Sequence, residues 1–520
     1  MEALLREVNA LLVDFPGEQA SLACVLERVK TSTRESTSSA PTLPERVLTE
    51  QALRRLAELA TPPAELFYDD PDLDEPDLPP PQARSDFLKR VPPMTELAEE
   101  LLRYSSNAEE SPNREELALR ATLVVAFGRH TPDSGLGVPG STAEIAPLLA
   151  SLSDVLPSSR LPLVRYLLTT SLPPYFKPHP ELNPSTGRVL SRPLGGDRGL
   201  NAWFDSSEQD PSSWRRQVGL AAVVNRVVEA LEPSEVEDLW PYLLPPLLAY
   251  LDDFESANKI RGTAILDTLL RRVDASLLRR TGVGKVFEKS LESCFSALSD
   301  PNTPRLLAAA HPVALRLAEL QYPPMRASDP VSVDKARFDA LCKLFASSVI
   351  YAWESKGQHA AIETVTARAM PPLLDAMGAA SIRYLQVIVP HLTELLVTTA
   401  TLGGLEGDGT WTLETATMML EASRALLAVV RNGRMRMARW EGKIGVAVAK
   451  CWLGQKGSRA SLALRESSAA GRTVLVELDG ALRDVLTALD GATTTPISTR
   501  LAPLPNFAEL LPLRAAEAAV

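Results

Sequence analysis

The chain has 520 residues, which exceeds one ordinary globular core, so it should either divide into domains or form an elongated repeat protein. Apolar residues make up 45% of the chain and aromatic residues only 5%, a composition that favours helix-on-helix packing over sheets. The formal net charge of −11 argues against a nucleic-acid partner, because phosphates repel an acidic surface that lacks a local basic stripe.

The cysteines and the first helix argue against further classes of protein. The four cysteines are scattered and form no C-x-x-C pair, so neither a zinc site nor a disulfide framework is expected. Residues 1–15 read as an amphipathic helix without the basic start and apolar middle of a signal peptide. No apolar run reaches the ~18 residues of a membrane span. We therefore expect no membrane among the partners.

Residues 1–61 are predicted to hold N-terminal helices joined by a Ser/Thr-rich linker. One helix is expected over 1–30, the linker over 31–44 and a second helix over roughly 45–60. Residues 62–93 then change in composition, with nine prolines and eight acidic side chains against three basic ones. Such a window buries too little apolar surface to order itself. We predict an acidic, Pro-rich flexible linker there, either a spacer or a docking peptide.

From residue 94 the chain becomes a series of helix-length apolar segments separated by turns. N-terminal helical repeats are predicted over 94–172 and C-terminal HEAT-like repeats over 214–490, followed by a weakly structured tail at 491–520. A long loop is expected at 173–213, and Trp203 and Trp214 near its end suggest that it packs back on the helices.

A short internal similarity indicates repeats. Pro-Pro-Leu-Leu occurs at 245–248 and again at 371–374, and the separation of 126 residues corresponds to three repeats of about 42. HEAT and armadillo repeats are ~40–47 residues long. The forty-two prolines also suit many short helices that begin or end at proline. The expected fold class is therefore all-α, an α-solenoid of HEAT- or armadillo-like repeats.

The clearest repeat unit spans 235–274 and contains two predicted helices. The first carries a leucine stripe, and Pro245 and Pro246 either start a new helix or kink a longer one. Asp252 and Asp253 follow, where they could cap the second helix or contact a partner. Gly262 in the second helix leaves room for a close approach between helices. Such a pair cannot bury its stripe alone and must stack on neighbours.

Motif searches yield no catalytic, cofactor-binding or metal-binding residues. Gly135-Leu-Gly-Val-Pro-Gly140 matches G-x-G-x-x-G, but the preceding segment has helical periodicity, so a turn is favoured over a dinucleotide site. The five histidines stand alone, without neighbouring ligands at metal-binding spacing. We expect no cofactor. An enzyme with a dispersed active site stays open as an alternative.

One basic run stands out near the C-terminal end of the predicted repeats. Arg436, Arg439 and Lys443 are spaced by three and four residues, which would place them on one helix face. An anionic ligand or an acidic segment of a partner could dock there. A solvated helix face is the alternative interpretation.

The unit at 235–274 also resembles a known family. Leu243-Leu-Pro-Pro-Leu-Leu248, Leu251-Asp-Asp253 and Asn258-Lys-Ile-Arg-Gly262 resemble the Tel-two-interacting protein two family, the smallest subunit of the TTT co-chaperone complex. Leu277–Phe287 resembles fungal members of that family. The close resemblance covers roughly 214–295. It marks Asp252, Asp253, Asn258, Lys259 and Gly262 as family-motif residues and as candidate partner contacts.

The resemblance implies a non-catalytic role. It implies an α-solenoid that binds its larger sister subunit, Tti-one, directly and reaches Tel-two through it. The complex would work with the HSP-ninety and R-two-TP chaperones on phosphatidylinositol 3-kinase-related kinases (PIKKs), including those of TOR and DNA-damage signalling. A cytoplasmic and nuclear location would follow. The alternative is an unrelated HEAT or armadillo adaptor or transport scaffold.

Overall fold

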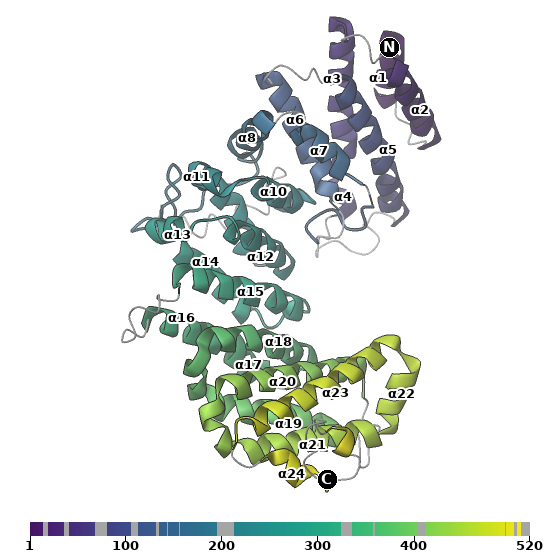
Figure 1. Ribbon diagram of the computed structural model, residues 1–520. Helices are drawn as coiled ribbons and strands as arrows, with labels where there is room; N and C mark the ends of the chain where they lie inside the picture. Colours follow the sequence, from purple (N-terminus) through teal and green to yellow (C-terminus); the bar gives the residue numbers. More distant parts are fainter. Residues whose placement is uncertain are drawn as a thin grey trace. The chain divides into compact units, whose positions relative to one another are not determined.

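The computed structural model describes most of the chain, and its helices are shown in Figure 1. The described residues are 1–13, 19–35, 41–67, 81–105, 113–131, 135–142, 144–154, 157–194, 213–323, 335–356, 359–402, 411–493, 496–503 and 507–510. They fall into two compact units, Met1–Phe287 (unit 1) and Glu288–Val520 (unit 2). Throughout the described residues the regular structure is helical, apart from one isolated antiparallel bridge, Leu182 to Val189. The prediction of an all-α chain is confirmed.

Unit 1 begins with helices that pack in pairs along the chain. They are α1 (Glu2–Val13), α2 (Gln19–Glu35), α3 (Leu43–Ala60), α4 (Ala64–Phe67), α5 (Pro81–Ser105) and α6 (Arg114–Phe127). Helix α1 packs on α3, α2 on α5, and α3 on α6 (Figure 1). The single helix predicted over 1–30 is wrong, because α1 ends at Val13 and α2 starts at Gln19. The sequence between them contains Pro16-Gly17, two residues that interrupt helices.

The flexible linker predicted over 62–93 is also wrong in its second half. Helix α5 starts at Pro81 and runs through Pro92 and Pro93. Its buried stripe recurs every three or four residues, which gives the helix an apolar face for packing: Phe87, Val91, Met94, Leu97 and Leu101. The composition of residues 62–93 as a whole did not reveal this stripe, because most acidic residues of that window lie near its start. Residues 68–80 of the predicted linker lie outside the described residues.

The remaining helices of unit 1 include α11 and α12, which carry the family motif. They are α7 (Ala146–Asp154), α8 (Pro157–Tyr166), a π-helical turn η3 (Leu167–Ser171), α10 (Leu220–Glu229), α11 (Pro233–Leu251), α12 (Ser256–Leu270), α13 (Ala275–Thr281) and α14 (Val283–Ser296), which crosses the unit boundary. Helix α10 packs on α12, and α11 packs on α12.

The described part of the predicted loop at 173–213 packs back on helix α11. Gly187 has a φ of +62°, and a Cβ atom there would lie 2.7 Å from Trp240 Cδ1 on α11. Trp214 is buried, with its ring centroid 4.5 Å from that of Tyr250. Trp203 lies outside the described residues. The described part of the loop is therefore held by close contacts with α11, where a side chain at 187 could not fit.

The helices of unit 2 follow one another from residue 303 to residue 501. They are α15 (Thr303–Gln321), α16 (Lys335–Phe345), α17 (Tyr351–Lys356), α18 (Ala360–Met377), α19 (Leu385–Leu402), α20 (Leu413–Asn432), α21 (Glu441–Gly457), α22 (Arg459–Ser467), α23 (Ala469–Asp490) and α24 (Ile497–Leu501). Short 3₁₀ or π-helical turns join several of them: η5 (Ala346–Ile350), η6 (Gly378–Tyr384) and η7 (Arg434–Arg439). A further 3₁₀ turn, η8 (Phe507–Glu509), follows α24.

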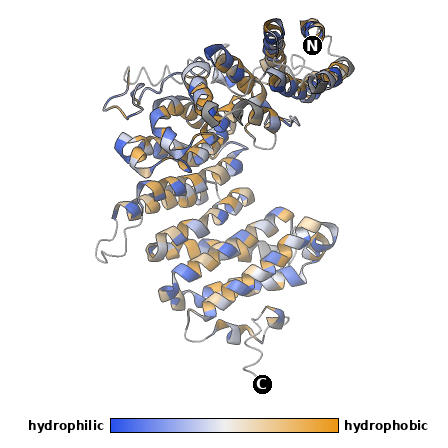
Figure 2. Ribbon diagram, turned by 45° about the horizontal axis from the view of Figure 1, so that its top comes forward, coloured by the Kyte–Doolittle hydropathy of each residue, from blue (hydrophilic) through white to orange (hydrophobic). Residues whose placement is uncertain are grey.

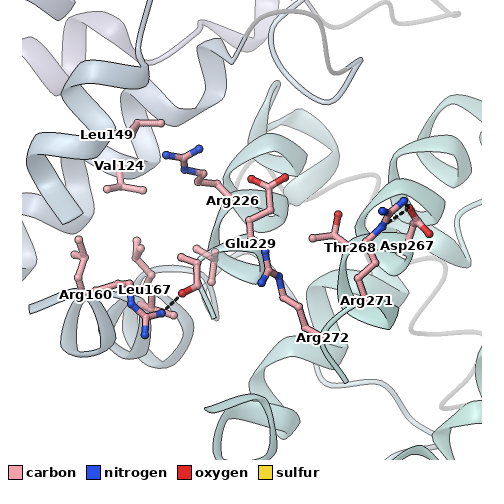
Figure 3. Close-up of a pocket in the computed structure, with 14 residues that line it drawn as sticks. Val124, Leu149, Arg160, Leu167, Arg226, Glu229, Asp267, Thr268, Arg271 and Arg272 are labelled. Atoms are coloured by element: carbon pink, nitrogen blue, oxygen red, sulfur yellow. Dashed lines mark hydrogen bonds and ion pairs between the residues drawn. The ribbon is translucent and has the colours of Figure 1, made fainter. Parts of the chain in front are cut away.

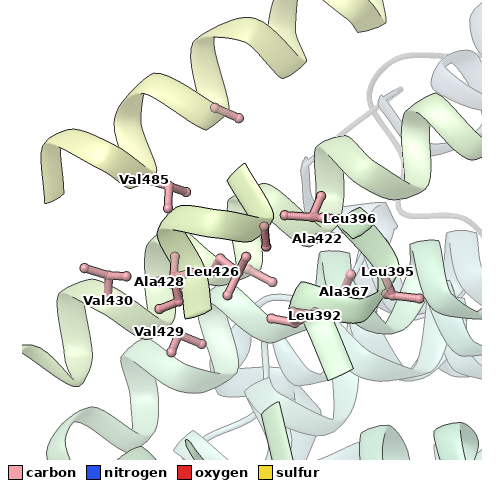
Figure 4. Close-up of a cluster of buried hydrophobic side chains, with 14 of the residues drawn as sticks. Ala367, Leu392, Leu395, Leu396, Ala422, Leu426, Ala428, Val429, Val430 and Val485 are labelled. Carbon is pink, nitrogen blue, oxygen red and sulfur yellow. The ribbon is translucent and has the colours of Figure 1, made fainter. Parts of the chain in front are cut away.

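Helix α20 is central to the apolar core of unit 2. It packs on α18, α19 and α23, and α19 packs on α21. Figure 4 shows Leu392 and Leu396 of α19 together with Ala422 and Leu426 of α20 and Val485 of α23. The helices carry hydrophobic and hydrophilic residues on different sides (Figure 2). Each fully buried leucine or valine stabilises the unit by roughly 1.5–3 kcal/mol.

The C-terminal segment is more ordered than the prediction of a weak tail over 491–520. Helix α24 lies within it, and the side chains of Phe507 and Leu510 are fully buried in the core of unit 2. Residues 511–520 lie outside the described residues. The proline-rich composition after residue 491 gave no indication that Phe507 and Leu510 would be buried.

Candidate functional site

The family motif lies where helix α11 turns into helix α12 in unit 1. Helix α11 runs unbroken through Pro245 and Pro246, so the prolines lie inside one long helix rather than starting a new one. The predicted leucine stripe is buried: Leu244, Leu247, Leu248 and Leu251. Asp252 follows the last residue of α11 as its C-cap, and its amide donates to the Leu248 carbonyl over 2.9 Å.

Asp253 forms an ion pair inside the protein. Its side chain is fully buried and pairs with Arg215, whose side chain is only 5% exposed. The carboxylate also accepts from Asn258 Nδ2 at 2.6 Å and from the Phe254 amide at 2.9 Å. Burial raises the pKa of the Asp253 carboxyl, while Arg215 and Asn258 oppose that rise. The Arg215 guanidinium lies 4.5 Å from the centroid of the exposed Phe254 ring.

The prediction that Asp252 and Asp253 cap the second helix is therefore wrong. Helix α12 starts after Glu255, whose side chain makes no capping hydrogen bond. The turn after α11 directs Asp253 inward to Arg215, two residues before the capping position. Asp252 instead lies 3.4 Å from Nε2 of the buried His179, in the loop before α10. The two aspartates thus connect His179 and Arg215 to the motif.

The rest of the motif is buried as well. Asn258 is 5% exposed and Lys259 is 6% exposed, and Asn258 Oδ1 accepts from Arg261 Nη1 at 2.6 Å. A Cβ atom on Gly262 would lie 2.5 Å from the Leu251 backbone nitrogen, so the predicted close approach between α11 and α12 is confirmed. A partner could not touch Asp253, Asn258 or Lys259 without opening this turn. These residues hold the turn together, and Asp252 alone among the motif carboxylates is partly exposed.

The basic run does not form one helix face. Arg436 and Arg439 lie in η7, whereas Lys443 lies in α21. Helix α20 ends because Gly433 follows it, and the buried Met437 anchors the 3₁₀ turn beyond. All three basic side chains are exposed, and the Arg439 guanidinium lies 5.8 Å from the centroid of the Trp440 ring. They remain accessible to an acidic segment but are presented by two elements.

Lys443 lines a shallow cavity of about 520 Å³ between α19 and α21. Glu394 and Val446 also line it, and Val446 is 51% exposed. The prediction found the lysine from charge spacing alone. Its neighbour Glu394 comes from a helix some fifty residues earlier, which no local pattern could reveal.

Sequence reasoning missed a cavity of unit 1 that has a volume of about 710 Å³. Helices α6, α7 and α8 supply apolar side chains that include Val124, Leu149 and Leu163. Most of the charged side chains come from α10 and from the C-terminal end of α12, and Arg160 comes from α8 (Figure 3). Four arginines line it, against two carboxylates: Arg160, Arg226, Arg271 and Arg272 against Glu229 and Asp267. A cluster of positive charge thus occurs within an acidic chain.

Buried histidines occur in both units. His130 in unit 1 has Nε2 2.7 Å from the Ala60 carbonyl, and burial lowers its pKa to about 4. His311 in unit 2 has Nδ1 2.7 Å from the Leu307 carbonyl, and burial lowers its pKa to about 4. Both are therefore neutral at physiological pH. Both imidazole rings lie in the protein interior.

His391 has a carboxylate neighbour that the sequence did not reveal. Its Nε2 lies 2.8 Å from Glu363 of α18, and its ring stacks on Trp353 at 3.9 Å. Glu363 is 1% exposed. A histidine and one carboxylate fall short of a metal site, and the described part of the chain has no cluster of three or more side chains suited to hold a metal ion.

Comparison with known proteins identifies the family. Among the described helices, none has the length and apolar character needed to cross a membrane. No curated protein matches the chain. The sequence profile of the Tti2 family matches residues 134–402, which is more than half of the 520 residues and includes the motif and most of the arginine-lined cavity. The chain therefore belongs to the Tti2 family.

Proposed function

We propose that this chain is a non-catalytic scaffold subunit of the TTT co-chaperone complex. The family match over residues 134–402 is the observation that carries the proposal. In this role the chain binds Tti-one directly and reaches Tel-two through it. Together with the HSP-ninety and R-two-TP chaperones, the complex supports maturation, stability and assembly of PIKKs. Such a role places the chain in both cytoplasm and nucleus.

We further propose that the helices form an α-solenoid of HEAT-like repeats. Helices two apart in the sequence pack against each other, as α10 does with α12 and α19 with α21. Stacked helical hairpins produce this pattern of contacts. A solenoid suits a scaffold because its repeats present a long, rigid surface, and a rigid surface loses little conformational entropy on binding.

Acute depletion of the chain tests the proposed role. A degradable version in cells should cause the protein levels of several PIKKs to fall together while their messenger RNA levels stay unchanged, because incompletely folded kinase is degraded. A kinase of another family serves as the control and should keep its level. Normal PIKK abundance after depletion would contradict the co-chaperone role.

An unrelated helical-repeat adaptor is the second candidate. Its partners would be cargo or phosphatase subunits, and depletion would leave PIKK levels unchanged. Rescue of depleted cells separates the two candidates further. Wild-type chain should restore PIKK levels under the TTT proposal and should have no effect on them under the adaptor proposal.

A further inference from the structure

The arginine-lined cavity of unit 1 has an excess of positive charge. Its four guanidinium groups face two lining carboxylates, and counting Glu235, which pairs with Arg160 at 2.7 Å, still leaves one positive charge in excess. The whole chain carries a net charge of −11, so a basic cavity is unusual on its surface. Such a cavity attracts anionic groups and repels cations.

Three of the four arginines are held by the protein. Arg160 donates to the Ala230 carbonyl, Arg271 pairs with Asp267 at 2.7 Å, and Arg272 donates to the Leu231 carbonyl at 3.3 Å. These contacts hold the guanidinium groups around the cavity, and Figure 3 shows those of Arg160 and Arg271. Preorganised groups lose less freedom when a ligand binds.

Arg226 is the cavity arginine whose guanidinium N–H groups are available to a ligand. It lies on α10, is exposed, and within the described residues its side chain makes no hydrogen bond or ion pair. The neighbouring carboxylate of Glu229 accepts from Asn225 Nδ2 at 2.8 Å, and within the described residues it forms no ion pair with Arg226. A guanidinium with free donors beside fixed ones can bind a carboxylate through two parallel hydrogen bonds.

We propose that this cavity binds an acidic segment of a partner protein. The charge excess selects carboxylates, and the cavity volume of about 710 Å³ accommodates a few side chains of a peptide. Val124, Leu149 and Leu163 give the opposite side an apolar character that suits a segment in which leucine interrupts the acidic residues. The inference deepens the proposed function, because it gives the chemistry of one segment that the scaffold would hold.

A peptide-binding experiment with the purified full-length chain tests the proposal. The probe is a fluorescein-labelled Glu-Glu-Leu-Glu-Glu-Leu-Glu-Glu peptide, followed by fluorescence anisotropy at low salt. We expect saturable binding that weakens as salt is added, since salt screens exposed charges. Arg226→Glu should weaken the binding roughly tenfold, because it replaces an attraction by a repulsion.

Matched controls make the result specific. Arg46→Glu changes the same charge on an exposed part of α3 in unit 1 and should leave peptide binding unchanged. Arg226→Glu should keep the melting temperature, since the side chain holds nothing in place. Equal losses in both variants, equal binding of a Lys-Lys-Leu peptide, or preferential binding of oligothymidine would overturn the proposal. Because no other subunit is present, failure here leaves the TTT assignment untouched.

Discussion

The two units differ in how exposed to solvent the partners of their buried charged side chains are. In unit 1, Asp253 and Arg215 pair with 0% and 5% of their side chains exposed. Among the described ion pairs of unit 2, the buried carboxylate always has a better solvated partner: Glu421 is 6% exposed, whereas Arg368 and Arg424 are 57% and 44% exposed. The comparison teaches that unit 1 uses a desolvated ion pair to fix a turn, whereas unit 2 uses apolar helix packing.

The largest expected effect comes from breaking the buried pair of unit 1. Asp253→Ala leaves Arg215 without its carboxylate, and removal of one partner of a buried pair costs about 3–5 kcal/mol. Hydrogen exchange of the full-length chain, read by mass spectrometry, should show lost protection in α11 and α12. Glu50→Ala, which removes an exposed pair with Arg54, should cost less than about 1 kcal/mol.

A double variant tests whether the loss comes from an unpaired buried charge. Asp253→Leu combined with Arg215→Met removes both charges and keeps the volume apolar, so it should recover much of the stability that Asp253→Ala loses. If Asp253→Ala proved as mild as Glu50→Ala, the ion pair would not fix the turn.

In unit 2 the most damaging change should remove an apolar side chain. Leu426→Ala opens a cavity at the centre of α20, and such changes cost about 2–5 kcal/mol. The loss of protection against hydrogen exchange should appear in α18, α20 and α23 and leave α11 and α12 unchanged. Equal loss in both units would contradict the assignment of Leu426 to a core that belongs to unit 2 alone.

Acidification should weaken both units alike through their histidines. Burial lowers the pKa of His130 and of His311 from 6.5 to about 4, so folding favours the neutral rings. Their contribution to stability is complete above pH 6.5 and is lost as the pH falls toward 4, by up to about 3 kcal/mol for each histidine. Denaturant unfolding across this pH range measures the effect. Unfolding midpoints that stay constant from pH 7 to about 4 would show that these rings are not buried as neutral groups.

The smallest effects should come from a matched pair of glycines. Gly262→Ala would place Cβ 2.5 Å from the Leu251 backbone nitrogen and push α11 away from α12, at a cost of roughly 1–3 kcal/mol. Gly442→Ala in α21 of unit 2 meets no atom within 4 Å and should stabilise by up to about 1 kcal/mol. Thermal melts compare the two, and the same sign for both would refute the close-approach argument.

The sequence predicted what depends on local periodicity. Helix α3, the leucine stripe of α11 and the role of Gly262 all follow from residues a few positions apart, where helical spacing applies. Helix α5 was not predicted, because the composition of residues 62–93 combined its apolar stripe with the acidic segment before it. A stripe search restricted to residues after 80 would have found it.

The candidate sites depend on contacts that no local pattern encodes. Arg215 meets Asp253 from thirty-eight residues away, and the arginines of the cavity come from helices spread over residues 157–272. The sequence therefore marked the motif as a candidate contact surface, although most of the marked residues are buried. Sequence reasoning also overlooked the exposed Arg226, because no other basic residue lies near it in the sequence.

The composition of the assembly purified with this chain tests the central claim most directly. A tagged full-length chain should bring down Tti-one and Tel-two in near-equal amounts, as measured by quantitative mass spectrometry, and Leu426→Ala should reduce this recovery more than Arg46→Glu. Recovery of neither subunit, with a different set of proteins at near-equal amounts, would contradict the assignment of this chain as a TTT scaffold.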